Sequence, residues 1–374
     1  MQSDERRTMI LDAAPERPWA PAEERKVQKG LVRRFVHRAL NKGKLAFRLY
    51  QAHFANPSHL DRVLGRKLRK HRGPILVGPW VSEVGFELLY WIPFLRHCMT
   101  RYRVDPSRVT VVSRGGAEGW YSGLAASYVD VFDLLSPEEF LEGNREREWL
   151  HRGKKQFSVS PFEARILEQA AAKAGLDGTE FFHPSLMYSY YRPFWSGLGD
   201  PGPVLGRSQP ALIGHAYERV PGLPFDGDYI AFKSYFSACF PETDDNAQFV
   251  SSLIDKLAAR SNVVLLNTGL RLDDHTEFGR AVGGRVFDAS GLMTPRNNLE
   301  IQSAIVAHSR GLVSTYGGFS YLGPLLARRS LGFYSTTEFV TTHLAIATET
   351  LNGVGSGTFS AVPTRGMDLL LGMD

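Results

Sequence analysis

Short apolar runs alternate with helical segments along most of this chain, and this alternation restricts the possible fold more than any other sequence feature. The runs include PILVGPW at residues 74–80, RVTVVS at 108–113 and NVVLLN at 262–267. Their length and β-branched content predict buried strands. Strands separated by helical segments predict parallel sheets with right-handed crossovers. We therefore expect an α/β protein.

The alternation stops in a segment rich in Gly and Pro, at residues 197–228, and then restarts. A length of 374 residues also suits two domains better than one. The predicted organisation is two Rossmann-like domains that face a cleft, preceded by a basic helical arm. The predicted parts are the arm at 1–72, an N-terminal domain at 73–200, a linker at 201–228 and a C-terminal domain at 229–374.

The N-terminal arm carries the basic charge of the chain. Residues 22–72 contain 15 Lys and Arg but only Glu23, Glu24 and Asp61 as acids. Apolar residues recur at near-helical spacing between the basic ones, which predicts a basic amphipathic helix. Such a helix can pack on its own protein, lie on an anionic membrane or bind nucleic acid. No nucleic-acid-binding module accompanies it, so nucleic acid is the least expected partner.

The remaining bulk features favour a cytoplasmic protein. Cys98 and Cys239 stand far apart and suggest neither a disulfide framework nor a zinc site. The first twenty residues lack the apolar core of a secretory signal. The most apolar stretch, residues 74–95, is interrupted by Glu83, Glu87 and Pro93 and predicts no membrane span. Peripheral contact with the inner membrane face through residues 22–72 stays open.

The strongest ligand-binding pattern is STYGGFSYLGPLL at residues 314–326. A strand is expected to end at Ser314 and Thr315, and a helix to begin near Ser320. The glycines between them let the backbone approach a ligand, and free N–H groups at a helix start attract phosphate. An ordinary glycine-containing turn between a strand and a helix is the alternative interpretation.

This segment resembles the donor-binding element of GT-B glycosyltransferases. The resemblance implies a GT-B-like arrangement with an acceptor-binding N-terminal domain and a nucleotide-sugar-binding C-terminal domain. It further implies that the pyrophosphate of the donor is held by this loop, namely by Ser314, Thr315, Tyr316, Gly317, Gly318 and Ser320.

Ligands in parallel sheets bind at the carboxyl ends of the strands, here the loops after residues 80, 113, 233, 267, 288 and 315. Lys233 ends the strand YIAFK and is placed to stabilise a diphosphate leaving group. Asn267, Thr268 and Gly269 follow another strand and are candidates for reading the base or ribose.

The segment GPWVSEVGFELLYW at residues 78–91 supplies the candidate catalytic base. Aromatic neighbours suit a base because an apolar setting raises a carboxylate pKa. Glu83 is the preferred base and Glu87 the second choice, although either carboxylate can instead interact with N–H groups at a helix start. Candidate acceptor-binding residues are Ser82, Arg114 and Gly115.

No cofactor or metal ion is expected. Asp226 and Asp228 spell the D-x-D motif of metal-dependent sugar transferases, but they precede a strand within the Pro/Gly-rich linker, where a turn explains them better. The sequence also lacks HExxH, CxxC, Walker A and GxSxG motifs.

The leading functional hypothesis is metal-independent transfer of a sugar from a nucleotide-sugar to a hydroxyl of a glycan or lipid-linked acceptor. A polysaccharide pyruvyl transferase or a nucleotide-sugar epimerase on the same fold is the alternative among enzymes. A non-catalytic protein that uses the basic arm to tether a complex to membrane or RNA is the alternative of another class, because fold alone does not establish catalysis.

Overall fold

The computed structural model describes residues 57–365, except 152, 154, 198, 271, 273–275, 279–282 and 338–339. These residues all belong to one compact unit, Ala52–Asp374. Most of the predicted basic arm, residues 1–56, lies outside the described residues. Every helix within them is too short or too polar to span a bilayer.

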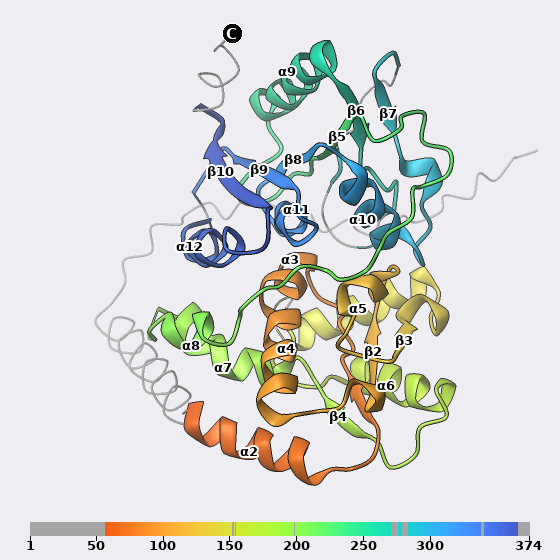
Figure 1. The fold of residues 1–374 in the computed structure, drawn as a ribbon, viewed down its shortest axis with the longest axis vertical. Coiled ribbons are helices and arrows are strands. Elements are labelled where there is room, and N and C mark those ends of the chain that lie inside the picture. Colours follow the sequence, from red (N-terminus) through yellow and green to blue (C-terminus); the bar gives the residue numbers. More distant parts are fainter. Residues whose placement is uncertain are drawn as a thin grey trace, which may run out of the picture. The chain divides into compact units, whose positions relative to one another are not determined.

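The first half of the described chain contains a four-stranded parallel sheet with the strand order β3-β2-β1-β4 (Figure 1). Its strands are β1 (Ile75–Val77), β2 (Val109–Ser113), β3 (Ser127–Asp130) and β4 (Glu180–Phe182). β1 and β2 are buried along their whole length, as expected for strands covered on both faces.

Helices pack on both faces of this first sheet. One face is covered by α5 (Pro137–His151) and α6 (Pro161–Lys173), whose apolar side chains cluster with Leu76 and Val112. The other face is covered by α2 (Pro57–Lys70), α4 (Ile92–Tyr102) and α7 (Ser185–Trp195). A capping box between Ser160 and Glu163 starts α6. Short helical segments complete this half: η2 (Pro106–Arg108), η3 (Ala117–Tyr121), η4 (Val131–Asp133) and α8 (Gly202–Leu205).

The helical segment after β1 contains one wide turn. α3 (Val84–Phe86) leads into η1 (Glu87–Trp91), a π-helical turn, and α4 follows. Pro93 lies in the first turn of α4. Proline lacks an N–H and clashes with the carbonyl four residues earlier, so a helix tolerates it in the first turn. Pro93 therefore begins a regular helix rather than ending one.

The second half contains a six-stranded parallel sheet with the order β10-β9-β8-β5-β6-β7. This is the doubly wound order found in dinucleotide-binding folds, with its switch point between β5 and β8. The strands are β5 (Tyr229–Lys233), β6 (Asn262–Leu265), β7 (Val286–Asp288), β8 (Gly311–Thr315), β9 (Arg329–Tyr334) and β10 (Thr358–Pro363).

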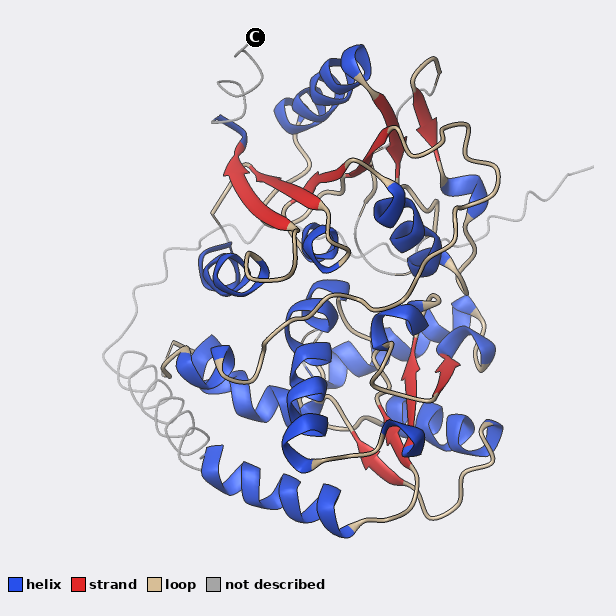
Figure 2. Cartoon of the chain, viewed as in Figure 1, coloured by secondary structure: helices blue, strands red, loops and turns tan. Residues whose placement is uncertain are grey.

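This second sheet is also covered on both faces (Figure 2). α9 (Asp244–Arg260) packs on one face through Val250, Leu253 and Ile254. Helices on the other face are α10 (Asn298–His308), α11 (Leu322–Leu325) and α12 (Val340–Leu351), with η5 (Ser290–Leu292) and η6 (Gly318–Tyr321) in the connections. Thr243 caps α9 by accepting from the N–H of Asn246.

The two sheets confirm the predicted α/β class with two Rossmann-like halves. The strands of the first sheet lie between residues 75 and 182 and those of the second between 229 and 363. Residues 206–228 contain neither helix nor strand. One core cluster continues from one half into the other. Polar contacts also join the halves: the Leu299 N–H donates to the Gly115 carbonyl at 2.7 Å, and Trp120 Nε1 donates to Ser303 Oγ at 2.8 Å.

Candidate functional site

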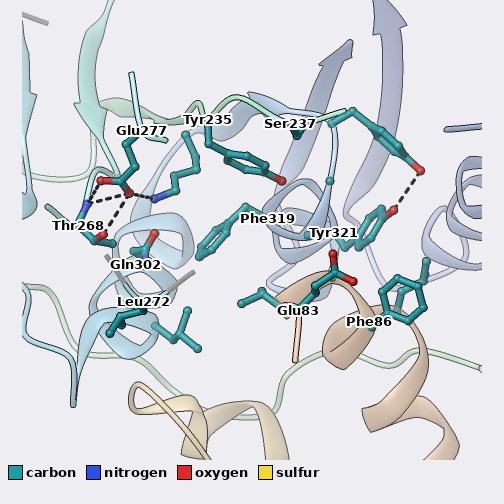
Figure 3. A pocket seen from close by; sticks show the side chains of 18 of the residues that line it. Glu83, Phe86, Tyr235, Ser237, Thr268, Leu272, Glu277, Gln302, Phe319 and Tyr321 are labelled. Atoms are coloured by element: carbon teal, nitrogen blue, oxygen red, sulfur yellow. Dashed lines mark hydrogen bonds and ion pairs between the residues drawn. The ribbon is translucent and has the colours of Figure 1, made fainter. Parts of the chain in front are cut away.

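A pocket of about 660 Å³ lies where the carboxyl ends of both sheets meet (Figure 3). The loops after β1, β2, β5, β6 and β8, five of the six predicted to bind ligands, all contribute to its lining, and α10, Lys155 and His343 contribute as well. Within the described residues, the loop after Asp288 contributes no lining residue. Since β5 and β8 flank the switch point of the second sheet, the pocket occupies the place where such sheets bind ligands.

Lys233, at the end of β5, lines the pocket as predicted. Its side chain is 7% exposed, and Nζ donates to the Leu266 carbonyl at 2.8 Å and to Glu277 Oε1 at 2.5 Å. Nζ also lies 5.4 Å from the ring centre of Phe319. The burial of this ammonium group strengthens its interaction with any anion that enters the pocket.

Glu277 is a pocket residue that the sequence did not indicate. Figure 3 shows its carboxylate beside Thr268, with hydrogen bonds between them. The N–H groups of Thr268 and Gly269 both donate to Oε2, at 2.8 and 3.0 Å. Thr268 lines the pocket. Gly269 does not line it, but its N–H donates to Glu277, which does.

Asn267 was predicted, together with Thr268, to read the base or ribose of the donor, but it does not line the pocket. Its Nδ2 donates to Asp288 Oδ2 at 2.9 Å. Asn267 therefore joins the ends of β6 and β7.

The loop after β8 divides into lining and buried positions. Tyr316, Gly317 and Gly318 line the pocket. The pocket lining does not include Ser314, Thr315 or Ser320, which are all fully buried. Ser320 Oγ donates to the Gly317 carbonyl at 2.6 Å, and Thr315 Oγ1 accepts from the Tyr235 N–H at 3.1 Å. The hydroxyl groups of Thr315 and Ser320 therefore hold the loop in shape.

The two glycines of this loop are required by close contacts. Gly317 has φ of 152°, and a Cβ there would collide with the Tyr235 hydroxyl. A Cβ on Gly318 would lie 2.5 Å from the backbone nitrogen of Gly85. Hence the backbone of η6 in the second half touches the backbone of α3 in the first half.

Glu83, the preferred base, lines the pocket from the first half. Figure 3 shows Glu83 and Phe86 on the first-half ribbon, and Glu277 and Thr268 on the second-half ribbon. Lys155 Nζ lies 3.5 Å from Glu83 Oε2 and 2.8 Å from the ring centre of Phe86. Glu83 thus stands beside a cation instead of in the apolar setting expected for it.

Glu87, the second choice, is fully buried and does not line the pocket. Its Oε1 accepts hydrogen bonds from Ser113 Oγ and Tyr121 Oη, each at 2.6 Å. Burial raises the pKa of Glu87 to about 7, against the lowering effect of these hydrogen bonds and of Arg114. The raised pKa expected of the base therefore belongs to a carboxylate inside the core.

Of the three predicted acceptor-binding residues, Arg114 alone lines the pocket. Its side chain is buried, and Nη2 donates to the Ser82 carbonyl at 2.9 Å. Ser82 is buried outside the pocket lining, and Gly115 uses its carbonyl to join the two halves.

The aromatic wall of the pocket includes a contact between the halves that the sequence did not indicate. Tyr90 Oη and His343 Nδ1 lie 2.7 Å apart, although 253 residues separate them in sequence. Burial and the nearby Lys155 lower the pKa of His343 to about 4. His343 is therefore neutral at physiological pH.

The D-x-D pair lies elsewhere. Asp226 and Asp228 are exposed, pair with Arg219 and Arg310, and do not line the pocket. Among the described residues, no group of three or more His, Cys, Asp or Glu side chains is arranged to hold a metal ion.

No protein-family model and no curated protein matches the chain. Solved structures similar to it include glycosyltransferases. A glycosyl transferase family 9 protein from Veillonella parvula has 12% identity and a TM-score of 0.45, over 82% of this chain and 90% of that one. The E. coli ADP-heptose lps heptosyltransferase II has 12% identity and a TM-score of 0.39, over 80% and 98%.

The UDP-GlcNAc 2-epimerase from Methanocaldococcus jannaschii has 10% identity and a TM-score of 0.35, over 79% of this chain and 90% of that one. At such identities and scores, no residue role passes from these proteins to this chain. The chemistry must rest on the pocket itself.

Proposed function

We propose that this chain is a metal-independent glycosyltransferase of the GT-B type. It moves a sugar from a nucleotide-sugar donor to a hydroxyl of a glycan or lipid-linked acceptor. The observation that carries the proposal is the pocket at the switch point, where Lys233 comes from one half and Glu83 from the other. A cation and a carboxylate in one pocket suit a reaction that releases a diphosphate and consumes a hydroxyl proton.

In the proposed reaction, the acceptor oxygen forms a bond to the anomeric carbon as the bond from that carbon to the diphosphate breaks. The diphosphate leaves with the electron pair of the broken bond, and Lys233 stabilises its charge. Glu83 accepts the proton of the acceptor hydroxyl. Lys155 Nζ lies 3.5 Å from Glu83 Oε2 and pairs with that carboxylate.

Metal independence follows in this proposal from the cations of the lining. Lys233, Arg114 and Lys155 line the pocket together with the acids Glu83 and Glu277. Fixed cations in a buried site can neutralise a leaving diphosphate without a bound ion.

The acceptor side of the proposal includes contact with a membrane surface. Described residues of the basic region contribute a helix with two faces: Leu64 and Leu68 of α2 are buried, whereas Arg66, Arg69 and Lys70 are exposed. A basic face of this kind attracts anionic lipid headgroups and would bring the enzyme to a lipid-linked acceptor.

The first test measures stabilisation of the purified protein by UDP, GDP, CMP, dTDP and ADP, with and without a divalent cation. We expect one nucleotide to raise the melting temperature without metal, because a ligand that binds the native state stabilises it. Lys233→Ala should lose most of this shift, whereas Lys256→Ala, which removes an exposed lysine of α9, should keep it.

The products then distinguish the alternatives. A transferase releases the free nucleotide diphosphate only when an acceptor is present, whereas an epimerase converts the sugar-nucleotide without an acceptor. Activity with phosphoenolpyruvate as donor would identify a pyruvyl transferase. No shift with any nucleotide at millimolar concentration would contradict the transferase and favour the tethering protein.

A further inference from the structure

The carboxylate of Glu277 lies in a set of hydrogen-bond donors that converge on its two oxygens. Thr268 Oγ1 and Lys233 Nζ donate to Oε1, at 3.1 and 2.5 Å. The backbone N–H groups of Thr268 and Gly269 donate to Oε2, at 2.8 and 3.0 Å. We call these four donor groups, without Glu277 itself, the anion cradle.

The backbone geometry explains why two successive N–H groups point to one anion. Gly269 has φ of 64°, in the left-handed region that glycine adopts without strain. Successive N–H groups in turns of this kind form concave sites that bind anions. The cradle lies at the ends of β5 and β6. It opens on the pocket, because the pocket is lined by Lys233, Thr268 and Glu277.

The backbone of Glu277 is held at this place. A β-bridge pairs it with Tyr235, and the Phe236 N–H donates to the Thr276 carbonyl at 3.0 Å. Because its backbone is tied to the segment after β5, displacement of the Glu277 carboxylate from the cradle requires rotation of its side chain.

The hydrogen-bonding capacity of a carboxylate decides between two roles for Glu277. Two oxygens offer about four lone-pair sites, and the cradle already supplies that many donors. Glu277 therefore has no site left for a substrate hydroxyl while it stays in place. Four donors that suit a carboxylate also suit a phosphoryl group, which carries more charge and more acceptor oxygens.

We propose that the anion cradle is the subsite for a phosphoryl group of the substrate, and that Glu277 occupies it as an internal anion until the substrate displaces it. The proposal rests on the proposed function for the identity of the substrate, a nucleoside diphosphate ester, but not for the existence of the subsite. Binding exchanges one anion for another, so the ion pair between Glu277 and Lys233 weakens the affinity of the pocket for phosphate esters.

Calorimetric titration of the full chain with inorganic pyrophosphate tests the subsite without reference to base or sugar. Glu277→Ala empties the cradle and Glu277→Gln removes only the charge. Both should bind pyrophosphate at least about fivefold more tightly than the parent chain, since an internal competitor is removed. Glu349→Gln, which removes an exposed charge of α12, should leave the affinity unchanged and controls for net charge.

Weaker or unchanged pyrophosphate binding in both Glu277 variants, with their melting curves still cooperative, would overturn the proposal. Weaker binding would show that Glu277 positions Lys233 for the ligand instead of competing with it. If the Glu277 variants bind pyrophosphate more tightly but the parent chain transfers no sugar, the subsite proposal is supported and the proposed glycosyltransferase function is contradicted. The two failures are therefore distinguishable.

Discussion

At the scale of single residues, the two properties expected of the base are found on two different carboxylates. Glu83 has the position, and Glu87 has the raised pKa. The four-residue spacing on one helical segment gave no way to tell which side chain would face the pocket. Burial of Glu87 depends on Ser113 and Tyr121, which reach it from β2 and η3. The separation is therefore a tertiary effect that no local pattern contains.

The buried Glu87 should make stability depend on pH. Its pKa is about 7 in the fold against 4.5 for an ordinary glutamate, so the folded state binds more protons between these values. The free energy of unfolding should therefore fall as pH rises from 4.5 to about 7, by about 3 kcal/mol. Glu87→Gln should remove this component.

Urea unfolding of both proteins across this pH range measures the effect. Subtraction of the Glu87→Gln curve removes every other titration that the two proteins share. Parallel curves for the two proteins would show that Glu87 does not titrate with a raised pKa.

At the scale of helices and strands, most of the alternation was predictable because most strands are short apolar runs with turn residues at their ends. The sequence did not predict β4, α7, α12 or β10. The hydroxyl groups of Ser314 and Thr315, at the end of β8, were expected to face a ligand. Strands buried on both faces show no alternation of polar and apolar residues, so the direction of Ser314 and Thr315 could not be inferred. Glu277 was missed because its partners come from the ends of other strands.

The contact between α3 and η6 gives a prediction at this scale. Gly318→Ala places a methyl group 2.5 Å from the backbone nitrogen of Gly85, so the two elements must separate. Overpacking of this kind costs about 1–3 kcal/mol. We expect a lower melting temperature and weaker nucleotide binding by calorimetry.

Gly291→Ala is the matched control, because a Cβ at Gly291 meets no atom within 4 Å. Its melting temperature and nucleotide affinity should equal those of the parent chain. An unperturbed Gly318→Ala protein would mean that the backbones of α3 and η6 do not touch in solution.

At the scale of the whole molecule, the basic face of α2 should direct the protein to anionic surfaces. Arg66 and Lys70 lie one turn apart on this exposed face, and each basic residue near an anionic leaflet contributes about 1 kcal/mol. The double variant Arg66→Glu and Lys70→Glu should bind phosphatidylglycerol vesicles at least about tenfold more weakly in sedimentation. The same reversal at the exposed Arg145 and Arg165, on α5 and α6, should change binding less.

Equal vesicle binding by both double variants would exclude the α2 face as a membrane contact. Binding of the parent chain that does not weaken with added salt would also contradict it, since attraction between surface charges is screened by salt.

The backbone contact between Gly85 and Gly318 also restricts how this sequence can change over evolutionary time. A side chain at either position would push α3 and η6 apart, so the residue tolerated at one position depends on the residue at the other. In descendants of a common ancestor, the two positions should stay small together or change together with their surroundings. Because the contact joins α3 of the first half to η6 of the second, a half taken from a related protein should need a small residue at the same position to fit.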